Sequence, residues 1–273
     1  MTDWSRLVRP SLVGIEPYRP GAYVRELRAV YGLDSLAKLN WNESLFDPYP
    51  GALEAAAAEL EHAWAYPEQA YGDFREAVAR WLVVPAERIV PAHGVQALVS
   101  MVAGAFLDAG DAVVVPRPTY GLYAQVSAAR GAGVHPVPLR DFRIDLPALA
   151  AAAGAHRARL VWVCDPNNPT GTLVAADEWP AFLDALPADC VVVVDEAYRE
   201  YAAPEVRVPR ERDVDEGRPV ILLRSFSKRW VGALLPFLKY RNRLRCSGVP
   251  ERPENGAGTL QINVDCIDCF GVF

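Results

Sequence analysis

The sequence contains no run of about 18 uncharged apolar residues, so we expect no membrane-spanning helix. Its first residues have neither the basic start nor the apolar run of a secretory signal peptide. Basic residues are outnumbered by acidic ones, 28 to 34, and form no basic stripe, which argues against nucleic-acid binding. Five cysteines in 273 residues do not suggest a disulfide framework. These absences predict a cytoplasmic protein with neither a membrane nor a nucleic acid as its partner.

The sequence also lacks the motifs of a structural zinc site and of a nicotinamide-binding site. Three of the five cysteines, Cys246, Cys266 and Cys269, lie near the C-terminus, but a structural zinc site needs four ligands. The nearest histidine in sequence is His156, and the four histidines are scattered. No G-x-G-x-x-G follows a candidate strand, so a nicotinamide site lacks its main signal. We therefore expect neither a metal site nor a nicotinamide site.

What is present is typical of one large folded domain with additions at both ends. Hydrophobic residues make up 51% of the chain and charged residues 23%, with both signs interspersed. Residues 1–38 are interrupted by proline and glycine and are expected to form an N-terminal arm. Residues 39–238 are the predicted domain. Residues 239–252 have no helical or strand rhythm, and residues 239–273 are an atypical tail of unknown structure.

Short apolar runs bounded by polar residues predict four strands, at 113–115, 160–164, 191–194 and 220–223. The runs are continuous rather than alternating, as in strands that helices cover on both faces. We expect helices at about 53–64, 71–82, 96–108, 119–130, 145–153 and 177–186. The alternation of strands and helices predicts an α/β fold of three layers, α/β/α, with a mostly parallel sheet.

Distinctive polar groups follow the predicted strands, where ligands bind in such sheets. They are Pro118-Thr119-Tyr120, Pro166-Asn167-Asn168-Pro169-Thr170-Gly171, Asp195-Glu196-Ala197-Tyr198 and Ser225-Phe226-Ser227-Lys228. The set holds a lysine, a carboxylate, an asparagine and tyrosines. Pyridoxal 5′-phosphate (PLP) requires this collection, because a lysine forms its Schiff base and an acid keeps its pyridine nitrogen protonated.

The same segments resemble histidinol-phosphate aminotransferases, which are PLP enzymes of fold type I. The similarity lies in VCDPNNPTGTL (163–173), VVVVDEAYREYA (191–202) and LLRSFSK (222–228), preceded by PAHGVQAL (91–98) and PRPTYGLY (116–123). LNWNESLFDPYP (39–50) and WAYPE (64–68) are similar to the N-terminal region of the family. The resemblance covers residues 36–228 and implies that residues 39–238 are the PLP-binding large domain of that fold, incomplete at its end.

The resemblance assigns roles around the cofactor ring. Lys228 is implied as the Schiff-base lysine, which also moves the proton between the substrate Cα and the cofactor C4′. Asp195 would pair with the pyridine nitrogen. Asn168 and Tyr198 would hydrogen-bond the ring oxygen, and Tyr120 would stack on the ring. Asn168 also lies in a sequence that favours a turn, and the two roles are compatible.

The resemblance also assigns a phosphate site and a second subunit. Ser225 and Ser227 would contact the phosphate, together with the backbone amides of Val95 and Gln96 at a helix N-terminus. Tyr66 is similar to a tyrosine that the family donates to the phosphate of the neighbouring subunit. The resemblance therefore implies a homodimer.

The chain departs from the family pattern after the lysine. The family places a phosphate-binding arginine eight residues past it, where this chain has Pro236, which offers neither charge nor a backbone donor. A lesser departure is Val95-Gln96-Ala97, where the family has a small residue followed by an acidic one. The small C-terminal domain of the family, with its substrate-binding arginine, is expected to be absent. A shifted reading frame would account for the change, and translation of the coding sequence in all three frames tests this.

Three functions remain open from the sequence. The first is a PLP-dependent transaminase that moves an amino group between an amino acid, or a histidinol phosphate-like amine, and a 2-oxo acid. The second is a PLP decarboxylase or lyase of the same fold. The third is a truncated remnant that is non-catalytic or binds PLP weakly.

Overall fold

The computed structural model describes residues 3, 6–15, 24–37, 39, 42–43, 51–62, 64–66, 70–228 and 269–272. Its α-helices are α1 (Val24–Tyr31), α2 (Ala52–Glu59), α3 (Gly72–Leu82), α4 (Gly94–Phe106), α5 (Leu122–Ala129), α6 (Leu146–His156), α7 (Trp179–Asp184) and α8 (Glu211–Asp215). Its short 3-10 helices are η2 (Pro10–Leu12), η3 (Leu60–His62), η4 (Ala86–Arg88), η5 (Arg199–Tyr201) and η6 (Pro204–Val206).

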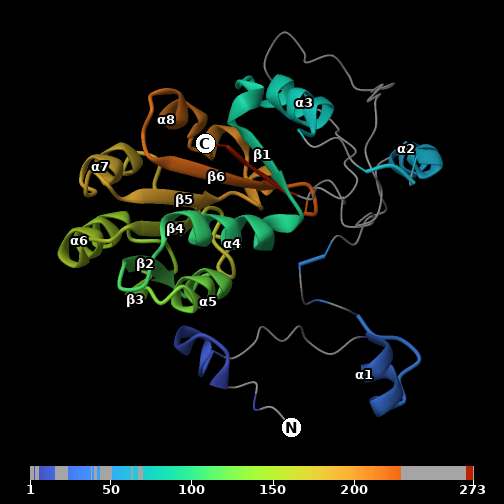
Figure 1. Ribbon diagram of the computed structural model, residues 1–273, viewed down its shortest axis with the longest axis horizontal. Helices are drawn as coiled ribbons and strands as arrows, with labels where there is room; N and C mark the ends of the chain where they lie inside the picture. The colour runs from blue at the N-terminus through green and yellow to red at the C-terminus, as the bar shows by residue number, and fades with distance from the viewer. Residues whose placement is uncertain are drawn as a thin grey trace.

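A single seven-stranded sheet forms the centre of the molecule (Figure 1). Its strands are β1 (Ile89–Ala92), β2 (Ala112–Arg117), β3 (Gly133–Pro138), β4 (Leu160–Cys164), β5 (Val191–Asp195), β6 (Val220–Ser225) and β7 (Cys269–Val272). The order across the sheet is β1-β7-β6-β5-β4-β2-β3. The pairs from β3 across to β6 are parallel, and β7 runs antiparallel to both of its neighbours. The predicted mostly parallel α/β fold is therefore confirmed.

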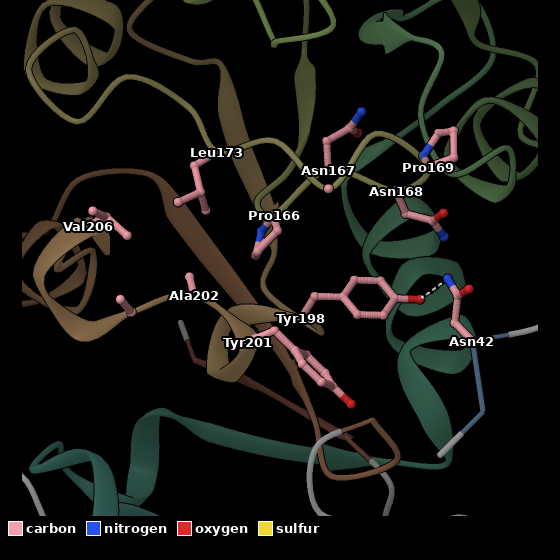
Figure 2. Close-up of a pocket in the computed structure, with 12 residues that line it drawn as sticks. Asn42, Pro166, Asn167, Asn168, Pro169, Leu173, Tyr198, Tyr201, Ala202 and Val206 are labelled. Atoms are coloured by element: carbon pink, nitrogen blue, oxygen red, sulfur yellow. Dashed lines mark hydrogen bonds between the residues drawn. The ribbon is translucent and has the colours of Figure 1, made fainter. Parts of the chain in front are cut away.

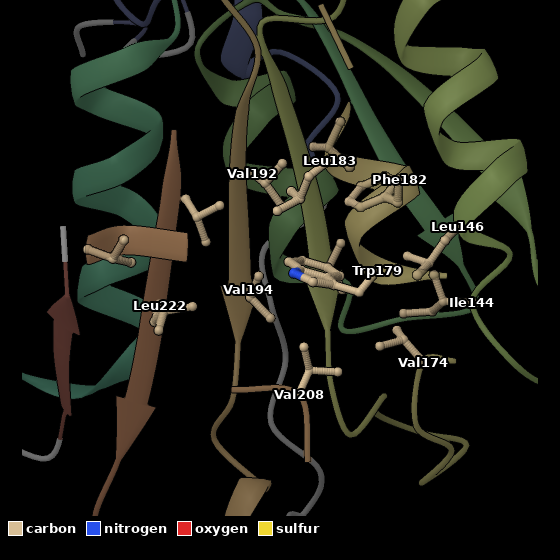
Figure 3. Close-up of a cluster of buried hydrophobic side chains, with 14 of the residues drawn as sticks. Ile144, Leu146, Val174, Trp179, Phe182, Leu183, Val192, Val194, Val208 and Leu222 are labelled. Atoms are coloured by element: carbon tan, nitrogen blue, oxygen red, sulfur yellow. The ribbon is translucent and has the colours of Figure 1, made fainter. Parts of the chain in front are cut away.

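Helices cover both faces of the sheet, and alternate strand residues point to opposite faces. In β4, Leu160 and Trp162 join a core cluster with α4 and α5, whereas Val161 and Val163 join a second cluster with α3, α6 and α7. Figure 3 shows part of this second cluster around Trp179. All five residues of β4 are buried, which explains why the run is continuously apolar.

Two strands that the sequence pattern did not predict lie at the edges of the sheet. In β3 the residues Pro136 and Pro138 break the pattern of a strand, and β1 contains Pro91. Proline cannot donate to a neighbouring strand, so it is tolerated where one side of the strand is unpaired. Among the described residues, β3 pairs only with β2, and β1 pairs only with β7. The edge position thus accounts for both omissions.

The ends of the chain contain regular structure as well. The expected N-terminal arm includes α1, and the expected helix at 53–64 is found as α2 followed by η3. In the tail, β7 inserts into the sheet between β1 and β6, while Pro236, Cys246 and Cys266 lie outside the described residues. No helix in the described part of the chain is both long enough and apolar enough to cross a bilayer.

Candidate cofactor site

A cavity of about 630 Å³ opens at the carboxyl ends of the central strands. It receives side chains from the ends of β4, β5 and β6, from the N-terminus of α4 and from the loop that precedes α5. Its lining residues are Asn42, His93, Gly94, Val95, Gln96, Tyr120, Gly121, Tyr123, Cys164, Asn168, Asp195, Ala197, Tyr198, Ser225, Ser227 and Lys228. The cavity therefore lies where ligands bind in parallel sheets.

Asp195, the last residue of β5, is a buried carboxylate in this cavity with 4% of its surface exposed. Its Oδ2 accepts a hydrogen bond of 2.6 Å from the Tyr123 hydroxyl, and its Oδ1 accepts one of 3.0 Å from the Ala197 amide. Burial raises the pKa of Asp195, and the two donors and the charge of Lys228 oppose that rise. The hydrogen bonds fix the plane of the carboxyl group.

Lys228 and Tyr198 lie together at another wall of the cavity. The Lys228 Nζ lies 5.6 Å from the centroid of the Tyr198 ring and donates to the Asn42 carbonyl at 3.2 Å. The Asn42 amide in turn donates to the Tyr198 hydroxyl oxygen at 2.9 Å. Burial raises the pKa of Tyr198, so its hydroxyl stays protonated at neutral pH. Tyr198 can therefore donate a hydrogen bond to an acceptor in the cavity.

The N-terminus of α4 forms an anion-binding end of the cavity. Gly94 begins the helix with a φ of +82°, a conformation that residues with a Cβ rarely adopt. Val95 and Gln96 follow in the first turn, where backbone amides have no partner within the helix. The hydroxyls of Ser225, the last residue of β6, and of Ser227 are 2.6 Å apart and line the same cavity. Amides and hydroxyls at a helix N-terminus are suited to a phosphate group.

A second cavity of about 390 Å³ adjoins the first one, and Figure 2 shows the residues that line it. Asn42, Asn168 and Tyr198 line both cavities. The second cavity extends to Tyr201 and Val206 and has mostly apolar walls. Tyr120 lies in the first cavity, where its hydroxyl oxygen accepts a 3.0 Å hydrogen bond from the Gln96 side chain. Two cavities thus meet at the Asn168 and Tyr198 side chains.

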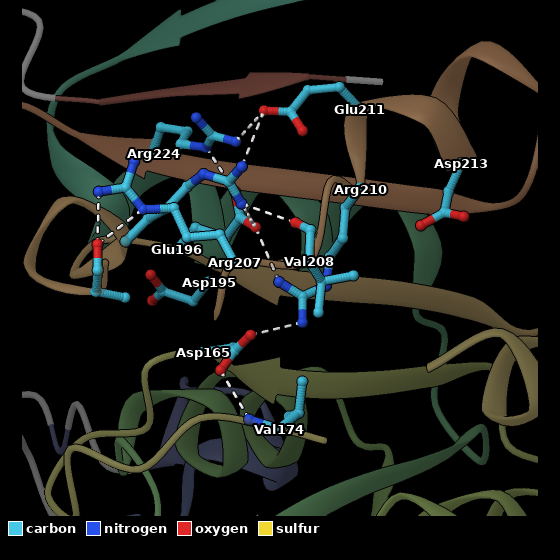
Figure 4. Close-up of polar contacts among 12 residues, drawn as sticks. Asp165, Val174, Asp195, Glu196, Arg207, Val208, Arg210, Glu211, Asp213 and Arg224 are labelled. Carbon is cyan, nitrogen blue, oxygen red and sulfur yellow. Dashed lines mark hydrogen bonds and ion pairs between the residues drawn. The ribbon is translucent and has the colours of Figure 1, made fainter. Parts of the chain in front are cut away.

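A buried ionic network lies behind the site and links the ends of β4, β5 and β6 (Figure 4). Arg210, 1% exposed, donates to Asp165 at 2.6 Å and to Glu196 at 2.9 Å. Glu196 also accepts from Arg224 at 2.6 Å and from Arg199 at 3.0 Å. Burial alone would raise the pKa of Glu196, but the arginines lower it to about 2. Because Glu196 follows Asp195 directly, the network anchors the backbone of the site.

Nine of the ten side chains or amides predicted from the sequence line the first cavity. The exception is Tyr66, which is 94% exposed and absent from the lining. The sequence reasoning missed Tyr123, Cys164 and Arg210. Tyr123 lies three residues after Tyr120 in the PRPTYGLY segment, but nothing in the sequence indicates that it contacts Asp195. Within the described residues there is no cluster of three or more potential metal ligands.

Comparison with protein families gives a match over most of the chain. The model of a family described as "Aminotransferase class I and II" matches residues 34–233. A histidinol-phosphate aminotransferase of Symbiobacterium thermophilum is 38% identical over 221 residues, which are 81% of this chain and 60% of that protein. An aromatic amino acid aminotransferase of Thermobifida fusca is 40% identical over 223 residues, with the same two shares.

Solved aminotransferase structures are also similar to this chain. The crystal structure of the histidinol-phosphate aminotransferase of Sinorhizobium meliloti in complex with pyridoxal-5′-phosphate superposes with a TM-score of 0.74 and 31% identity. The match covers 82% of this chain and 59% of that one. The chain thus spans about 60% of the length of the curated relatives it matches.

Proposed function

Because the chain belongs to the aminotransferase class I and II family, we propose that it binds PLP and acts as a transaminase. The amino group would move between an amino acid, or a histidinol phosphate-like amine, and a 2-oxo acid. One observation carries the proposal: Lys228, Asn168 and the pair Asp195 and Tyr198 come from three segments of the chain and meet in one cavity. Each of them has the chemistry that one part of the cofactor needs.

The donor set of the cavity fits PLP at each end. A pyridine nitrogen requires a carboxylate that is buried and held in one orientation, and Asp195 meets both conditions. A phosphate requires amide and hydroxyl donors, and the start of α4 with Ser225 and Ser227 provides them. The flat ring between these ends requires an aromatic neighbour, and Tyr120 lies in the lining. The cavity volume also lies in the range of cofactor and small-ligand sites.

When bound, PLP supplies an electron sink that stabilises negative charge at the substrate Cα. The residues of the chain hold it and move protons. Asp195 would keep the proton on the pyridine nitrogen, and Tyr198 and Asn168 would donate to the ring oxygen. Lys228, which would bind the cofactor covalently, would move the proton between the substrate Cα and the cofactor C4′. The Lys228 nitrogen lies beside the Tyr198 ring, so the proposed proton-transfer group and the donor to the ring oxygen share one wall of the cavity.

The test is a transfer assay with two amino donors. Purified protein with added PLP is given histidinol phosphate or phenylalanine, with 2-oxoglutarate as acceptor, and glutamate is measured. Both donors are tried because both types of relative are similar to this chain. Glutamate formation that is lost in Lys228→Ala supports the proposal, and Arg159→Ala is the matched control for loss of a cation away from the site. Release of carbon dioxide without glutamate would instead indicate a decarboxylase.

The remnant hypothesis has support of its own. The resemblance places Pro236 at the position where the family has a phosphate-binding arginine. A lost charge-assisted contact costs about 1.5–3 kcal/mol, or at least about tenfold in affinity. A chain that binds PLP at Lys228 but transfers no amino group from any donor would be a cofactor-binding module rather than an enzyme.

We also propose a homodimer to which Tyr66 contributes across the subunit interface. Leu39, Trp64 and Tyr66 are 85%, 78% and 94% exposed in the single chain. A second copy placed against this segment would cover them. Light scattering gives the mass in solution, and Tyr66→Phe should weaken PLP binding if the hydroxyl reaches the partner's phosphate. A cytoplasmic location and a role in amino-acid biosynthesis stay predictions.

A further inference from the structure

We propose that Tyr123 is a positioning residue, which sets the orientation of Asp195 toward the ring nitrogen of the bound cofactor. The inference rests on the proposed function, because it concerns the same site. Tyr123 does not act on the substrate. It acts through the carboxylate that would hold the proton of the pyridine ring.

Tyr123 contacts Asp195 directly. The Tyr123 hydroxyl donates to Asp195 Oδ2 at 2.6 Å, and both residues are buried, with exposures of 0% and 4%. Burial and the neighbouring Asp195 charge hold the pKa of Tyr123 well above its ordinary value. The hydroxyl therefore remains a donor across the physiological pH range. A hydrogen bond to a carboxylate in such a place is strong, because both groups are buried.

The second observation is that the Tyr123 ring is held from several sides. It stacks on Trp162, with the ring centroids 4.9 Å apart and the planes at 9°. It also meets Tyr120 edge to face at 5.4 Å. The Tyr123 carbonyl accepts a 2.7 Å hydrogen bond from Ser127, whose oxygen also accepts from the Trp162 indole. The phenol thus has little freedom to leave Asp195.

The third observation is the position of Tyr123 between two cofactor contacts. Its ring touches Tyr120, the predicted stacking residue, and its hydroxyl touches Asp195, the predicted partner of the pyridine nitrogen. Tyr123 therefore holds the residue that is predicted to stack on the cofactor ring and the residue that is predicted to pair with its nitrogen in one arrangement. With Oδ2 occupied by the phenol and Oδ1 by the Ala197 amide, the remaining lone pairs of Asp195 are directed by the protein.

The experiment compares two ligands on Tyr123→Phe, which keeps the ring and its stacking but loses the donor. The ligands are pyridoxamine 5′-phosphate and an analogue with a carbon atom in place of the ring nitrogen. Neither carries an aldehyde, so neither forms a Schiff base with a lysine, and calorimetry gives both affinities without any turnover. We expect Tyr123→Phe to bind pyridoxamine phosphate about tenfold more weakly or worse. Its affinity for the nitrogen-free analogue should change by less than about threefold, because that analogue makes no bond through the atom that Asp195 serves.

The matched control is Trp179→Phe. Trp179 is also a buried aromatic residue that donates to an aspartate, Asp213, at 2.8 Å, but it lies outside the cavity. This variant should lose stability and keep the wild-type ratio of the two affinities. Circular dichroism melts establish that each variant is folded. If Tyr123→Phe does not fold, 4-aminophenylalanine at position 123 retains the ring and a donor and should retain the ratio.

Equal weakening of both ligands by Tyr123→Phe, or no weakening of either, would overturn the inference, as would loss of the ratio in the 4-aminophenylalanine variant. These results differ from failure of the proposed function. In that case the unsubstituted chain would bind neither ligand, and the inference would fail with it.

Discussion

Replacement of Arg210 by methionine tests the importance of the ionic network behind the site. Arg210 is 1% exposed and pairs with both Asp165 and Glu196, and its guanidinium lies 4.2 Å from the centroid of the Trp179 ring. Methionine has a similar length and no charge. The variant would leave Asp165 with a lone charge in the core, while Glu196 would keep Arg199 and Arg224.

Breaking a buried ion pair by removal of one partner costs about 3–5 kcal/mol, because the remaining charge is left uncompensated. The loss is a large fraction of the total stability of a domain, which is about 5–15 kcal/mol. Urea denaturation followed by tryptophan fluorescence measures it. The matched control is Arg218→Met, which removes an exposed pair with Asp184 and should cost less than about 1 kcal/mol.

A free energy of unfolding for Arg210→Met within 1 kcal/mol of the wild type would refute this reasoning. It would mean that the network contributes no more than a surface pair. A double variant, Arg210→Met with Asp165→Asn, separates the two terms, because it removes the stranded charge as well. It should recover part of the loss.

Three further predictions concern the site and its surroundings. The pKa of Glu196 is about 2 in the folded protein and lies below its value in the unfolded chain. The stabilisation that Glu196 provides is therefore present above about pH 4.5 and is lost as the pH falls toward 2. The midpoint of urea denaturation should drop across this pH range, and it should drop less in Glu196→Gln. Gly94→Ala places a Cβ at a φ of +82° and should weaken pyridoxamine phosphate binding by about tenfold, whereas Gly154→Ala in α6 should not. Asn42→Ala removes a donor that lowers the pKa of Tyr198, so the phenolate of Tyr198 should form at a higher pH in an ultraviolet titration, with Tyr198→Phe as the blank. An unchanged titration would contradict the Asn42 contact.

The central strands could be predicted because their sequence is governed by local burial. Residues 160–164 and 191–194 are apolar without a break, and in the structure helices cover both faces of β4 and β5. The edge strands β1 and β3 could not be predicted in this way. Their prolines are allowed by an unpaired side, and which strand has such a side depends on the whole topology.

The residues of the candidate site also fall into those that the sequence predicts and those that it does not. Residues such as Asp195 and Lys228 were found because each follows a strand and carries distinctive chemistry. Tyr123 and Arg210 were missed because their roles depend on partners 72 and 45 positions away. Neither residue type is diagnostic alone, since a tyrosine on a helix or an arginine after a loop has many ordinary roles. Only the folded chain shows which carboxylate each one meets.

The most direct test of the account is a covalent one. Protein incubated with PLP is reduced with borohydride, digested and mapped by mass spectrometry. We expect a pyridoxyl label on the peptide that contains Lys228, with no label at that position in Lys228→Arg. A label on Lys38 or Lys239 in place of Lys228, or none at all, would contradict the assignment of this cavity as a PLP site.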